Sequence, residues 1–425
     1  MSEKITVLSD GVEGLFIRNP RFNTTLVSLN FYMPLKEETS AAMGLLPFVL
    51  TTCSKKYPDF SKLNFKLAKL YGARLEASAE KVGDMQLLKV AVSVIDDSFT
   101  LDGESLCTQA CELLENLVFE PKAENGAFCE EDVEREKRKA IEHIRGEVSE
   151  KRIYAKKRLI EEMYKGKPYG VAKCGTEEQV AALDGAALYK AWEKVLSSAF
   201  VRVNVISRAM PSGLFDGLSS RFSSLSRFDI TDCTVCEPTR KARAVRTVTE
   251  RMDIAQGKLA LGFSSRMHGG DAQTMALLVM CDMFGGGPYS KLFSNVREKM
   301  SLCYYCSASS VRSKGLITVD SGVEAPNAER AYEAILDQLE SVKRGDFTDF
   351  EFSASIKSLK DSFKSFEDSQ ASLDTWYSMR VGDRTPRSPE DTAELLNAVD
   401  RKAVVSAANG VYLHTVYKLL PEEKE

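Results

Sequence analysis

Residues 284–304 read FGGGPYSKLFSNVREKMSLCY and combine a glycine triplet, a proline and a charged segment that ends in an aromatic stretch. Glycine is disfavoured in helix interiors, so Gly285, Gly286 and Gly287 are expected to end the helix that begins near Asp271. Pro288 suits the first turn of the next helix, where a backbone N–H is not needed. The stretch therefore predicts a helix, a tight break, a second helix and then a strand.

Working outward from this stretch, the chain shows two halves of similar design. Residues 177–205 predict two short helices and then a strand in which Val201, Val203 and Val205 alternate with polar residues. Residues 390–417 repeat this plan about half a chain later. Earlier in each half, a strand leads into a helix and a strand pair follows, at 25–32 and 74–94 in the first half and at 258–263 and 304–322 in the second.

The short turns between paired strands indicate mainly antiparallel sheets. The predicted class is α+β, with two homologous α/β-sandwich domains, each a mainly antiparallel sheet covered by helices, arranged as a clamp. Residues 1–228 would form the first domain, 229–246 a linker and 247–425 the second. The charged segment 130–163 predicts one or two amphipathic helices.

The bulk composition is that of an ordinary folded protein. The chain has 425 residues, a hydrophobic fraction of 44% and a formal net charge of −4. Because both signs of charge are interspersed, we expect neither nucleic acid nor a membrane surface as a partner. The first residues lack the apolar region of a secretory signal, so we expect a cytoplasmic protein with reduced cysteines.

Residues 284–304 resemble the GGG-x-x-S-x-L-F…REK-x-x-L-x-Y pattern of the pitrilysin/insulinase-type zinc peptidases, the inverted zincins. Residues 168–170, PYG, and 175–178, GTEE, are similar to that family's PYG…GT-x-E segment. The motifs keep their order along nearly the whole chain. The resemblance implies a two-domain body that holds a peptide between its halves.

The resemblance also implies where a zinc site would lie. In the family, an H-x-x-E-H helix supplies two imidazoles and a general base, and a later glutamate completes the metal ligands. Here Pro47, Leu50 and Thr51 occupy the positions of the first histidine, the glutamate and the second histidine. The later glutamate maps onto His143, although Glu142 beside it leaves a shift of one residue open. Proline and leucine have no donor atom for zinc, so we expect no bound metal and no cofactor.

The histidine count supports this expectation without an alignment. The chain has three histidines, His143, His268 and His414, and no two lie within one helical turn. Neither H-x-x-E-H nor H-E-x-x-H can therefore occur. Because proline is tolerated near the start of a helix, Pro47 predicts a helix that begins just after Gly44.

The cysteine pairs are expected to be structural. Residues 233–236 and 303–306 are both C-x-x-C, but 70 residues separate them, which is too far for a zinc ribbon. In a regular strand, Cys303 and Cys306 would face opposite sides of the sheet. Cys107 and Cys111 are expected on a buried helix face.

Arg297 and Tyr304 are the candidate chemical residues. The resemblance implies that, in active relatives, the matching arginine and tyrosine come from the second domain, bind the substrate carbonyl and stabilise the oxyanion. It also implies that Gly285, Gly286 and Gly287 approach the bound peptide. The structural alternative is a surface ion pair for Arg297, a half-buried strand position for Tyr304 and a simple helix end for the glycines.

The chain resembles a bacterial subgroup of insulinase-like proteins that lack the zinc motif and are linked to modification of elongation factor P. The resemblance implies a non-catalytic subunit that pairs with a zinc-bearing paralogue as a heterodimer, or associates with itself, and helps to hold a peptide substrate. A purely structural scaffold subunit is the alternative. An autonomous peptidase with an unrelated site is the third and least favoured possibility.

Overall fold

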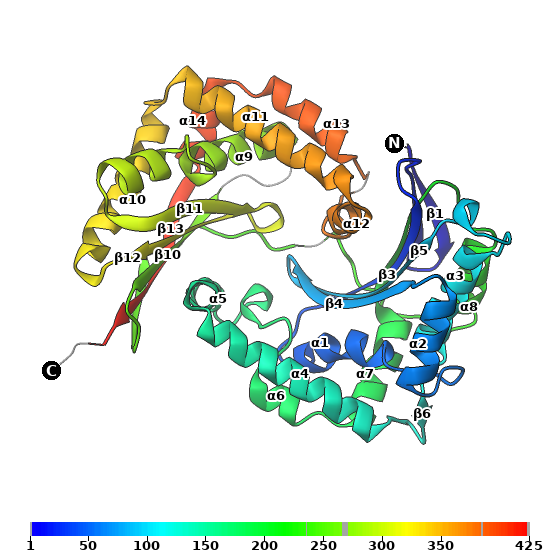
Figure 1. Cartoon of the computed structure of the whole chain (residues 1–425). Helices are drawn as coiled ribbons and strands as arrows, with labels where there is room; N and C mark the ends of the chain where they lie inside the picture. The colour runs from blue at the N-terminus through cyan, green and yellow to red at the C-terminus, as the bar shows by residue number, and fades with distance from the viewer. Residues whose placement is uncertain (1, 235, 266–270, 384–385, 423–425) are drawn as a thin grey trace. The chain divides into compact units, whose positions relative to one another are not determined.

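The computed structural model describes residues 2–234, 236–265, 271–383 and 386–422, so His268 lies outside the described residues. The chain forms two compact units (Figure 1). Unit 1 comprises Met1–Arg145, Val171–Val235 and Glu367–Ser388, and unit 2 comprises Gly146–Gly170, Cys236–Phe366 and Pro389–Glu425. Among the described residues, no helix combines the length and the apolar character needed to cross a bilayer.

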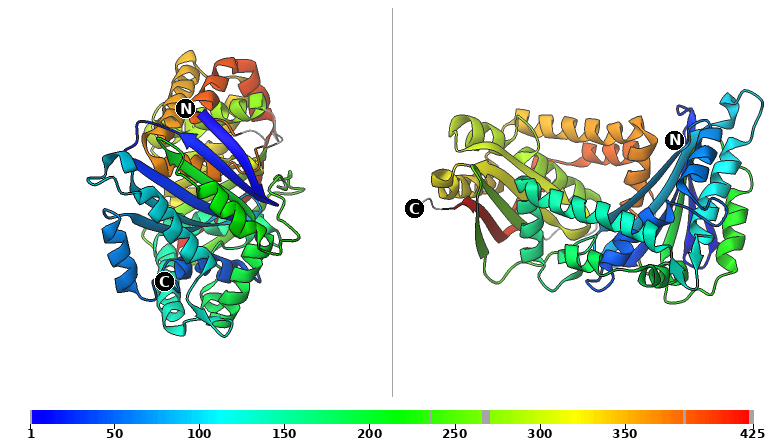
Figure 2. Two further views of the ribbon diagram at one scale, coloured as in Figure 1. Left: turned by 90° about the vertical axis from the view of Figure 1, so that its right-hand side faces the viewer. Right: turned by 60° about the horizontal axis from the view of Figure 1, so that its bottom comes forward.

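Unit 1 contains a six-stranded sheet with the order β1-β2-β8-β3-β5-β4. All neighbouring strands are antiparallel except β2 and β8, which are parallel. The left view of Figure 2 shows the blue N-terminal strands of this sheet. The strands are β1 (Ser2–Ser9), β2 (Val12–Arg18), β3 (Thr24–Pro34), β4 (Arg74–Val82), β5 (Met85–Ile95) and β8 (Phe200–Ser207).

One face of the unit 1 sheet carries the main apolar core, to which α1, α3, α7 and α8 contribute buried side chains. The alternating valines of β8 are fully buried there, as their spacing predicts. The helices of this unit are α1 (Ser40–Leu50), α2 (Phe60–Lys69), α3 (Leu106–Phe119), most of α4 (Glu130–Ser149), α6 (Glu177–Ala181), α7 (Gly185–Ser198), α8 (Leu214–Ser223) and α12 (Gln370–Ser378); a small hairpin consists of β6 (Ala123–Glu124) and β7 (Ala127–Phe128).

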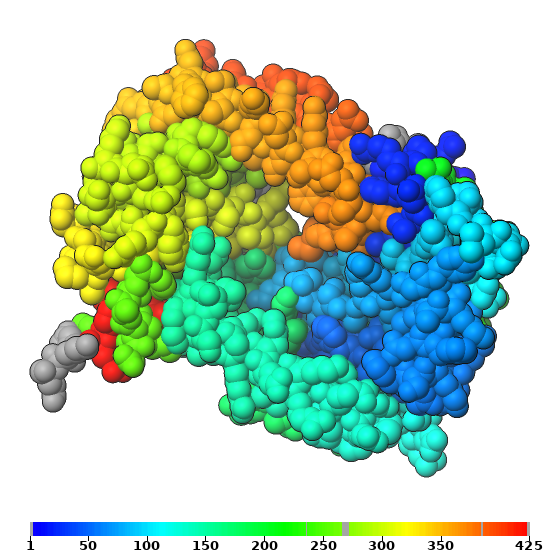
Figure 3. Space-filling model, viewed as in Figure 1, coloured from blue at the N-terminus to red at the C-terminus, as the bar shows by residue number. Residues whose placement is uncertain are grey.

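Unit 2 contains a five-stranded sheet with the order β11-β12-β10-β13-β9. Its strands are β9 (Arg246–Met252), β10 (Gly257–Ser265), β11 (Cys303–Val311), β12 (Leu316–Val323) and β13 (Val411–Pro421). Its helices are α5 (Lys151–Met163), α9 (Asp271–Gly285), α10 (Ala328–Arg344), α11 (Asp349–Ser365), α13 (Pro389–Glu394), α14 (Arg401–Asn409) and the π-helix η3 (Leu292–Lys299). The orange helix α11 lies at the outer surface of this unit in Figure 3.

Apart from the edge strand β1 of unit 1, the two sheets have the same topology, as expected for two halves with one sequence plan. Both β3 and β10 are buried central strands that lead into a helix. In unit 1, β3 lies between β8 and β5, and in unit 2, β10 lies between β13 and β12. In both units one flanking strand follows two short helices, and the other is the second strand of the predicted strand pair. Beyond β8 and β13, one parallel neighbour, β2 or β9, completes the match. The predicted α+β class with mainly antiparallel sheets is confirmed.

One helix from each half of the chain packs in the other half's unit. The segment 130–163 forms two helices, as predicted, and the second of these, α5, packs on β10 and β13 of unit 2. Helix α12, from the second half, packs on β3 and β8 of unit 1. The compact units are therefore not two consecutive segments, and the boundaries 1–228, 229–246 and 247–425 stay a prediction about the repeated halves.

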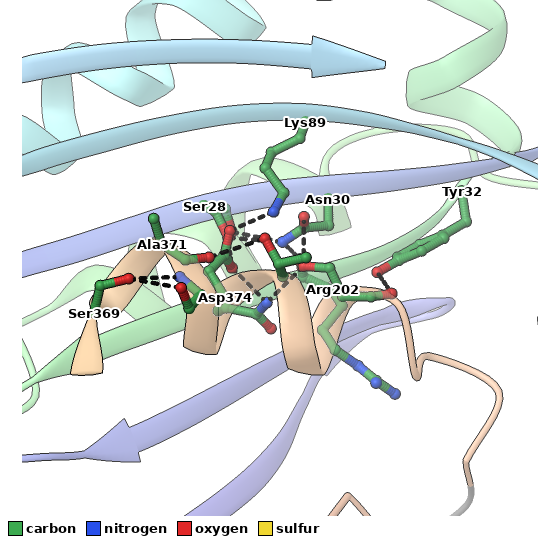
Figure 4. A network of polar contacts seen from close by, with 12 residues as sticks. Ser28, Asn30, Tyr32, Lys89, Arg202, Ser369, Ala371 and Asp374 are labelled. Atoms are coloured by element: carbon green, nitrogen blue, oxygen red, sulfur yellow. Dashed lines mark hydrogen bonds and ion pairs between the residues drawn. The ribbon is translucent and has the colours of Figure 1, made fainter. Parts of the chain in front are cut away.

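The contact between α12 and the unit 1 sheet is a buried polar network (Figure 4). The Asp374 carboxylate accepts hydrogen bonds from Ser28 Oγ at 2.6 Å and Asn204 Nδ2 at 2.7 Å, and it pairs with Lys89 Nζ at 2.5 Å. The Tyr32 hydroxyl donates to the backbone oxygen of Ser378 at 2.8 Å. Further along the helix, the Ser378 hydroxyl donates to Asn30 Oδ1 at 3.0 Å.

The contact between α5 and the unit 2 sheet has an apolar centre. Its buried residues are Ala155, Leu159, Ala260, Tyr417 and Leu419. Charged groups lie at its edge, where Glu250 accepts hydrogen bonds from the hydroxyls of Tyr154, at 2.7 Å, and Tyr417, at 2.6 Å. Arg152 Nε of α5 also pairs with the buried Asp320 carboxylate of β12 at 2.5 Å, so both contacts include charges and differ mainly at their centres.

Candidate functional site

Helix α1 carries the positions at which the family's zinc motif would lie. The helix begins at Ser40, so the predicted start after Gly44 is wrong, and Pro47 lies inside the helix. The physical reason is packing: Ser40 and Met43 are buried, and burial holds the first turn although Pro47 has no N–H for the carbonyl of residue 43. The Thr51 hydroxyl donates to the carbonyl oxygens of Pro47, at 3.1 Å, and Phe48, at 2.9 Å.

The neighbouring segment 173–175 packs tightly against α1. A Cβ atom at Gly44 would lie 2.7 Å from the Cα atom of Cys174 and 2.9 Å from the backbone oxygen of Lys173. The side-chain amide of Gln86 donates to the backbone oxygens of Ser40, at 3.0 Å, and Lys173, at 2.5 Å. This arrangement fixes α1 as a packed structural element.

The zinc-motif positions do not form a metal site. Pro47 and Leu50 are buried apolar side chains of α1, whereas His143 is exposed on α4. Glu142, the alternative third ligand, is exposed as well. Within the part of the chain that the structure describes, no three His, Cys, Asp or Glu side chains are grouped so that they could hold a metal ion.

The glycine triplet ends α9, as its sequence predicts. A Cβ atom at Gly285 would lie 2.5 Å from the backbone nitrogen of Ala308, so only glycine fits between α9 and β11. Gly286 is exposed. The loop folds over Asp282, whose carboxylate accepts a hydrogen bond from the Tyr289 hydroxyl at 2.5 Å, and burial raises the pKa of Asp282 above its usual range. The glycines therefore have a packing role, and their contact with a peptide stays a prediction.

Arg297 lies in the π-helix η3, which the sequence did not predict. The Met300 N–H donates to the Asn295 carbonyl oxygen at 2.9 Å, the i→i+5 pattern that defines this geometry. Runs of π-helix are rare and occur frequently at functional sites. The guanidinium lies over the Phe293 ring at 4.5 Å and its Nε is 3.5 Å from the carboxylate of the adjacent Glu298. Its side chain is 40% exposed, so it stays available to a ligand.

Tyr304 lies at the start of β11, the strand that follows η3 and packs against it. The residue is 56% exposed. Its hydroxyl donates to Glu324 Oε1 at 3.0 Å, and this hydrogen bond raises the pKa of Tyr304. The sheet register shifts between Cys303 and Tyr305, which makes Tyr304 the additional residue of a β-bulge. No feature of the sequence signals either the bulge or the π-helix.

Arg297 and Tyr304 thus occupy two adjacent irregular elements of unit 2, with both side chains exposed. The predicted surface ion pair of Arg297 is present, with Glu298 as the partner. The alternative that Tyr304 is a half-buried strand residue is wrong, because the bulge leaves it exposed. The duplicated α+β plan, together with this arginine and tyrosine, agrees with the resemblance of the motifs to the insulinase-type peptidases.

Comparison with known families supports this class. Residues 187–359 match the family described as Peptidase M16 inactive domain. Over these residues and in its fold, the chain is similar to inactive-type M16 peptidases, the insulinase/pitrilysin-like group that its motifs resemble.

Relatives of similar length include a "Probable inactive metalloprotease YmfF" of Bacillus subtilis (strain 168), 26% identical over 411 residues that cover 96% of each chain. A second protein of that strain, "Uncharacterized zinc protease YmxG", is 31% identical over 117 residues, which are 27% of this chain and 28% of that protein. Among solved structures, a conserved protein from Enterococcus faecalis V583 matches with a TM-score of 0.92 and 25% identity, covering 100% of this chain and 99% of that chain. A protease from Helicobacter pylori, 15% identical, shares the fold with a TM-score of 0.80 over 99% of both chains.

Proposed function

We propose that the chain is a non-catalytic subunit that pairs with a zinc-bearing paralogue and helps to form its peptide-binding chamber. Two proteins of one Bacillus strain support this proposal, because the chain is similar to both and one is described as an inactive metalloprotease, the other as a zinc protease. A partner that carries the metal would supply the ligands that Pro47, Leu50 and Thr51 cannot. Self-association is the alternative form of partnership.

The exposed pair Arg297 and Tyr304 is the observation that carries the proposal. An arginine N–H and a phenolic O–H are the donors that suit a substrate carbonyl and a developing oxyanion. Among the residues that the structure describes, Arg297 pairs with the exposed carboxylate of Glu298, and Tyr304 pairs with that of Glu324. Exposed ion pairs and hydrogen bonds of this kind contribute little to stability, so neither residue is needed to hold the fold. In the assembled pair we expect both side chains to face the peptide-binding chamber.

The second candidate is a scaffold subunit that contributes surface and no chemistry. The packing role of Gly285 and the buried α1 are compatible with a scaffold. The rare π-helix at Arg297 favours the first candidate, because π-helices occur frequently at functional sites and a scaffold surface does not require one. The predicted cytoplasmic location and the link to elongation factor P modification stay predictions under either reading.

The deciding experiment measures peptidase activity of the chain reconstituted with its zinc-bearing paralogue. Loss of one oxyanion donor typically lowers kcat on the order of a hundredfold, and we expect this from Tyr304→Phe. Arg297→Ala is expected to lower kcat/KM by a similar factor. The matched controls are Tyr332→Phe, a partly buried tyrosine of α10, and Arg344→Ala, an exposed arginine with a local carboxylate partner, Asp346.

Assembly of every variant is checked separately by gel filtration. If Tyr304→Phe and Arg297→Ala both assemble normally and leave turnover unchanged, the chain supplies no chemistry and the scaffold reading is correct. Metal analysis of the isolated chain after dialysis is expected to give far less than one zinc per chain. If the chain binds one zinc ion and His143→Ala loses it, the proposal that this subunit is non-catalytic is wrong.

A further inference from the structure

Two thiols lie on the same face of β11 because of the β-bulge at Tyr304. Cys303 pairs with Val323 of the neighbouring strand, and Cys306 pairs with Ser321. Val323 and Ser321 are two residues apart and therefore share a face of the sheet, and directly paired residues share a face as well. The sequence-based expectation that Cys303 and Cys306 face opposite sides is wrong, because Tyr304 adds one residue to the strand between them.

The two cysteines differ in exposure and in acidity. Cys306 is 5% exposed, whereas Cys303 is partly open to solvent. A hydrogen bond from the Cys306 thiol lowers the pKa of Cys303 to about 7; burial opposes this, and the Ser321 hydroxyl and the charge of Arg297 support it. The same thiol–thiol hydrogen bond, together with burial, raises the pKa of Cys306. The pair therefore combines an accessible thiolate with a shielded thiol beside it.

We propose that Cys303 and Cys306 are a thiol-redox site that reacts with small disulfides, such as glutathione disulfide, and closes to a reversible intramolecular disulfide. The positions opposite the two cysteines, Val323 and Ser321, are two residues apart and therefore about 6.6 Å apart at the usual rise per residue of a strand. Disulfides bridge Cα atoms up to roughly 6.8 Å apart, so the bulged spacing reaches this range. The site does not depend on the proposed pairing with a zinc-bearing paralogue.

The reaction takes two exchange steps. The Cys303 thiolate attacks one sulfur of glutathione disulfide, forms a mixed disulfide and releases one glutathione thiolate. Cys306 then loses its proton and attacks the sulfur of Cys303, which releases the second glutathione. The protein dithiol is oxidised by two electrons, the glutathione disulfide is reduced, and the two thiol protons end on the two glutathione molecules.

The other closely spaced pair, Cys107 and Cys111 on α3, lacks these properties. Both residues are buried in the core of unit 1, as the sequence predicts. Burial raises the pKa of Cys107 to about 11 and raises that of Cys111 further. Because the thiolate is the reactive form, this pair is expected to stay reduced under conditions that oxidise Cys303 and Cys306. It serves as an internal control.

The test incubates the folded full-length chain with glutathione disulfide at pH 7 and follows the cysteines by trypsin digestion and mass spectrometry. Cleavage after Lys299 and Arg312 releases residues 300–312, which contain Cys303 and Cys306 and no other cysteine. We expect this peptide to lose two hydrogen atoms and to regain them with dithiothreitol. Alkylation of Cys303 in the untreated chain should be half-maximal near pH 7.

Two variants separate the steps. Cys306→Ser is expected to stop at a stable glutathione adduct on Cys303, and Cys303→Ser is expected to form neither adduct nor disulfide. Cys107→Ser, the matched control, should oxidise at residues 300–312 like the unmodified chain. The proposal fails if the wild-type peptide keeps two alkylatable thiols while other cysteines react. It also fails if Cys306→Ser takes up no glutathione at Cys303. Both measurements use the isolated chain, so they do not depend on a paralogue.

Discussion

Helices α12 and α5 cover equivalent strands of two sheets with closely similar topology, yet the centres of the two contacts differ. Helix α12 lies on β3 and β8 through the network around Asp374, and α5 lies on β10 and β13 through the apolar cluster around Leu159. The two covered strands differ accordingly, because β3 presents Ser28 and Asn30 to its helix whereas β10 presents Ala260. Two sheets with a similar backbone arrangement can therefore be covered by helices through different side-chain contacts.

The difference has physical consequences for each contact. A buried charged network with several hydrogen bonds adds little net stability over an apolar contact, but it fixes one geometry and fails when a member is removed. An apolar contact is less directional and loses stability in proportion to the volume removed. We therefore expect α12 to be the more sensitive helix to a single substitution.

The largest effect is expected from Asp374→Ala. The substitution leaves the Lys89 ammonium, 13% exposed, without its buried carboxylate and removes the acceptor of Ser28 and Asn204. Breaking a buried pair in this way typically costs about 3–5 kcal/mol. Hydrogen exchange of residues 370–378 measures the opening free energy of α12 and checks the value.

The double substitution Lys89→Met with Asp374→Leu is the control for this result. It removes both charges, and replacement of a buried pair by apolar residues is often close to neutral. We expect at most about 1–2 kcal/mol from the hydrogen bonds that the Ser28 hydroxyl and the Asn204 amide lose. Equal losses in the single and the double variant would show that the charge at Asp374 has no special role at this helix.

A smaller effect is expected from Leu159→Ala at the other helix. Leu159 is fully buried between α5 and the sheet, next to Met163 and Gly262. Removing its side chain is expected to lower the opening free energy of α5 by about 3 kcal/mol, which is within the usual range for leucine in a core. Hydrogen exchange of residues 151–163 should become faster accordingly. The partly exposed Ile160→Ala on the same helix, expected to lose less, is the matched control. If Leu159→Ala costs more than Asp374→Ala, the proposed contrast between the two contacts is wrong.

Much of the fold follows from the sequence because its signals are local. Alternating Val201, Val203 and Val205 define β8, and the glycine triplet at Gly285 ends α9. The order of these elements in both halves is enough to predict two sheets of one topology. The exchange of α5 and α12 between the units has no such signal, because an amphipathic helix does not specify which sheet it covers.

The sequence predicted which residues occupy the candidate site, but it did not predict the backbone geometry around them. The loss of the zinc ligands can be read from Pro47, Leu50 and Thr51 alone, since side-chain chemistry excludes them as a metal set. The π-helix at Arg297 and the bulge at Tyr304 depend on how backbone hydrogen bonds shift within a packed unit. For the same reason, the spacing of Cys303 and Cys306 suggested opposite faces although the bulge places them on one.

The smallest effect is expected at the edge of the α5 contact, from Glu250→Gln. Burial acts to raise the pKa of Glu250, but hydrogen bonds from Tyr417 and Tyr154, together with Arg158, outweigh it and hold this pKa below its usual range. A glutamine keeps an oxygen acceptor for the two hydroxyls and loses the charge. At pH 7 we expect the opening free energy of α5 to fall by about 1 kcal/mol, because hydrogen bonds to charged acceptors are stronger than those to neutral ones.

The pH dependence distinguishes this charge effect from a change in packing. Because the pKa of Glu250 is lowered by folding, its contribution is complete above the unfolded value of about 4.3 and is lost as the pH falls through the lower folded value. Hydrogen exchange of residues 151–163 from pH 7 down to about pH 3 should therefore show a steeper loss in the unmodified chain than in Glu250→Gln, and the two curves should converge at the acid end. Parallel curves with a constant gap would mean that the substitution disturbs packing, and that the α5 contact owes nothing to the ionised carboxylate at its edge.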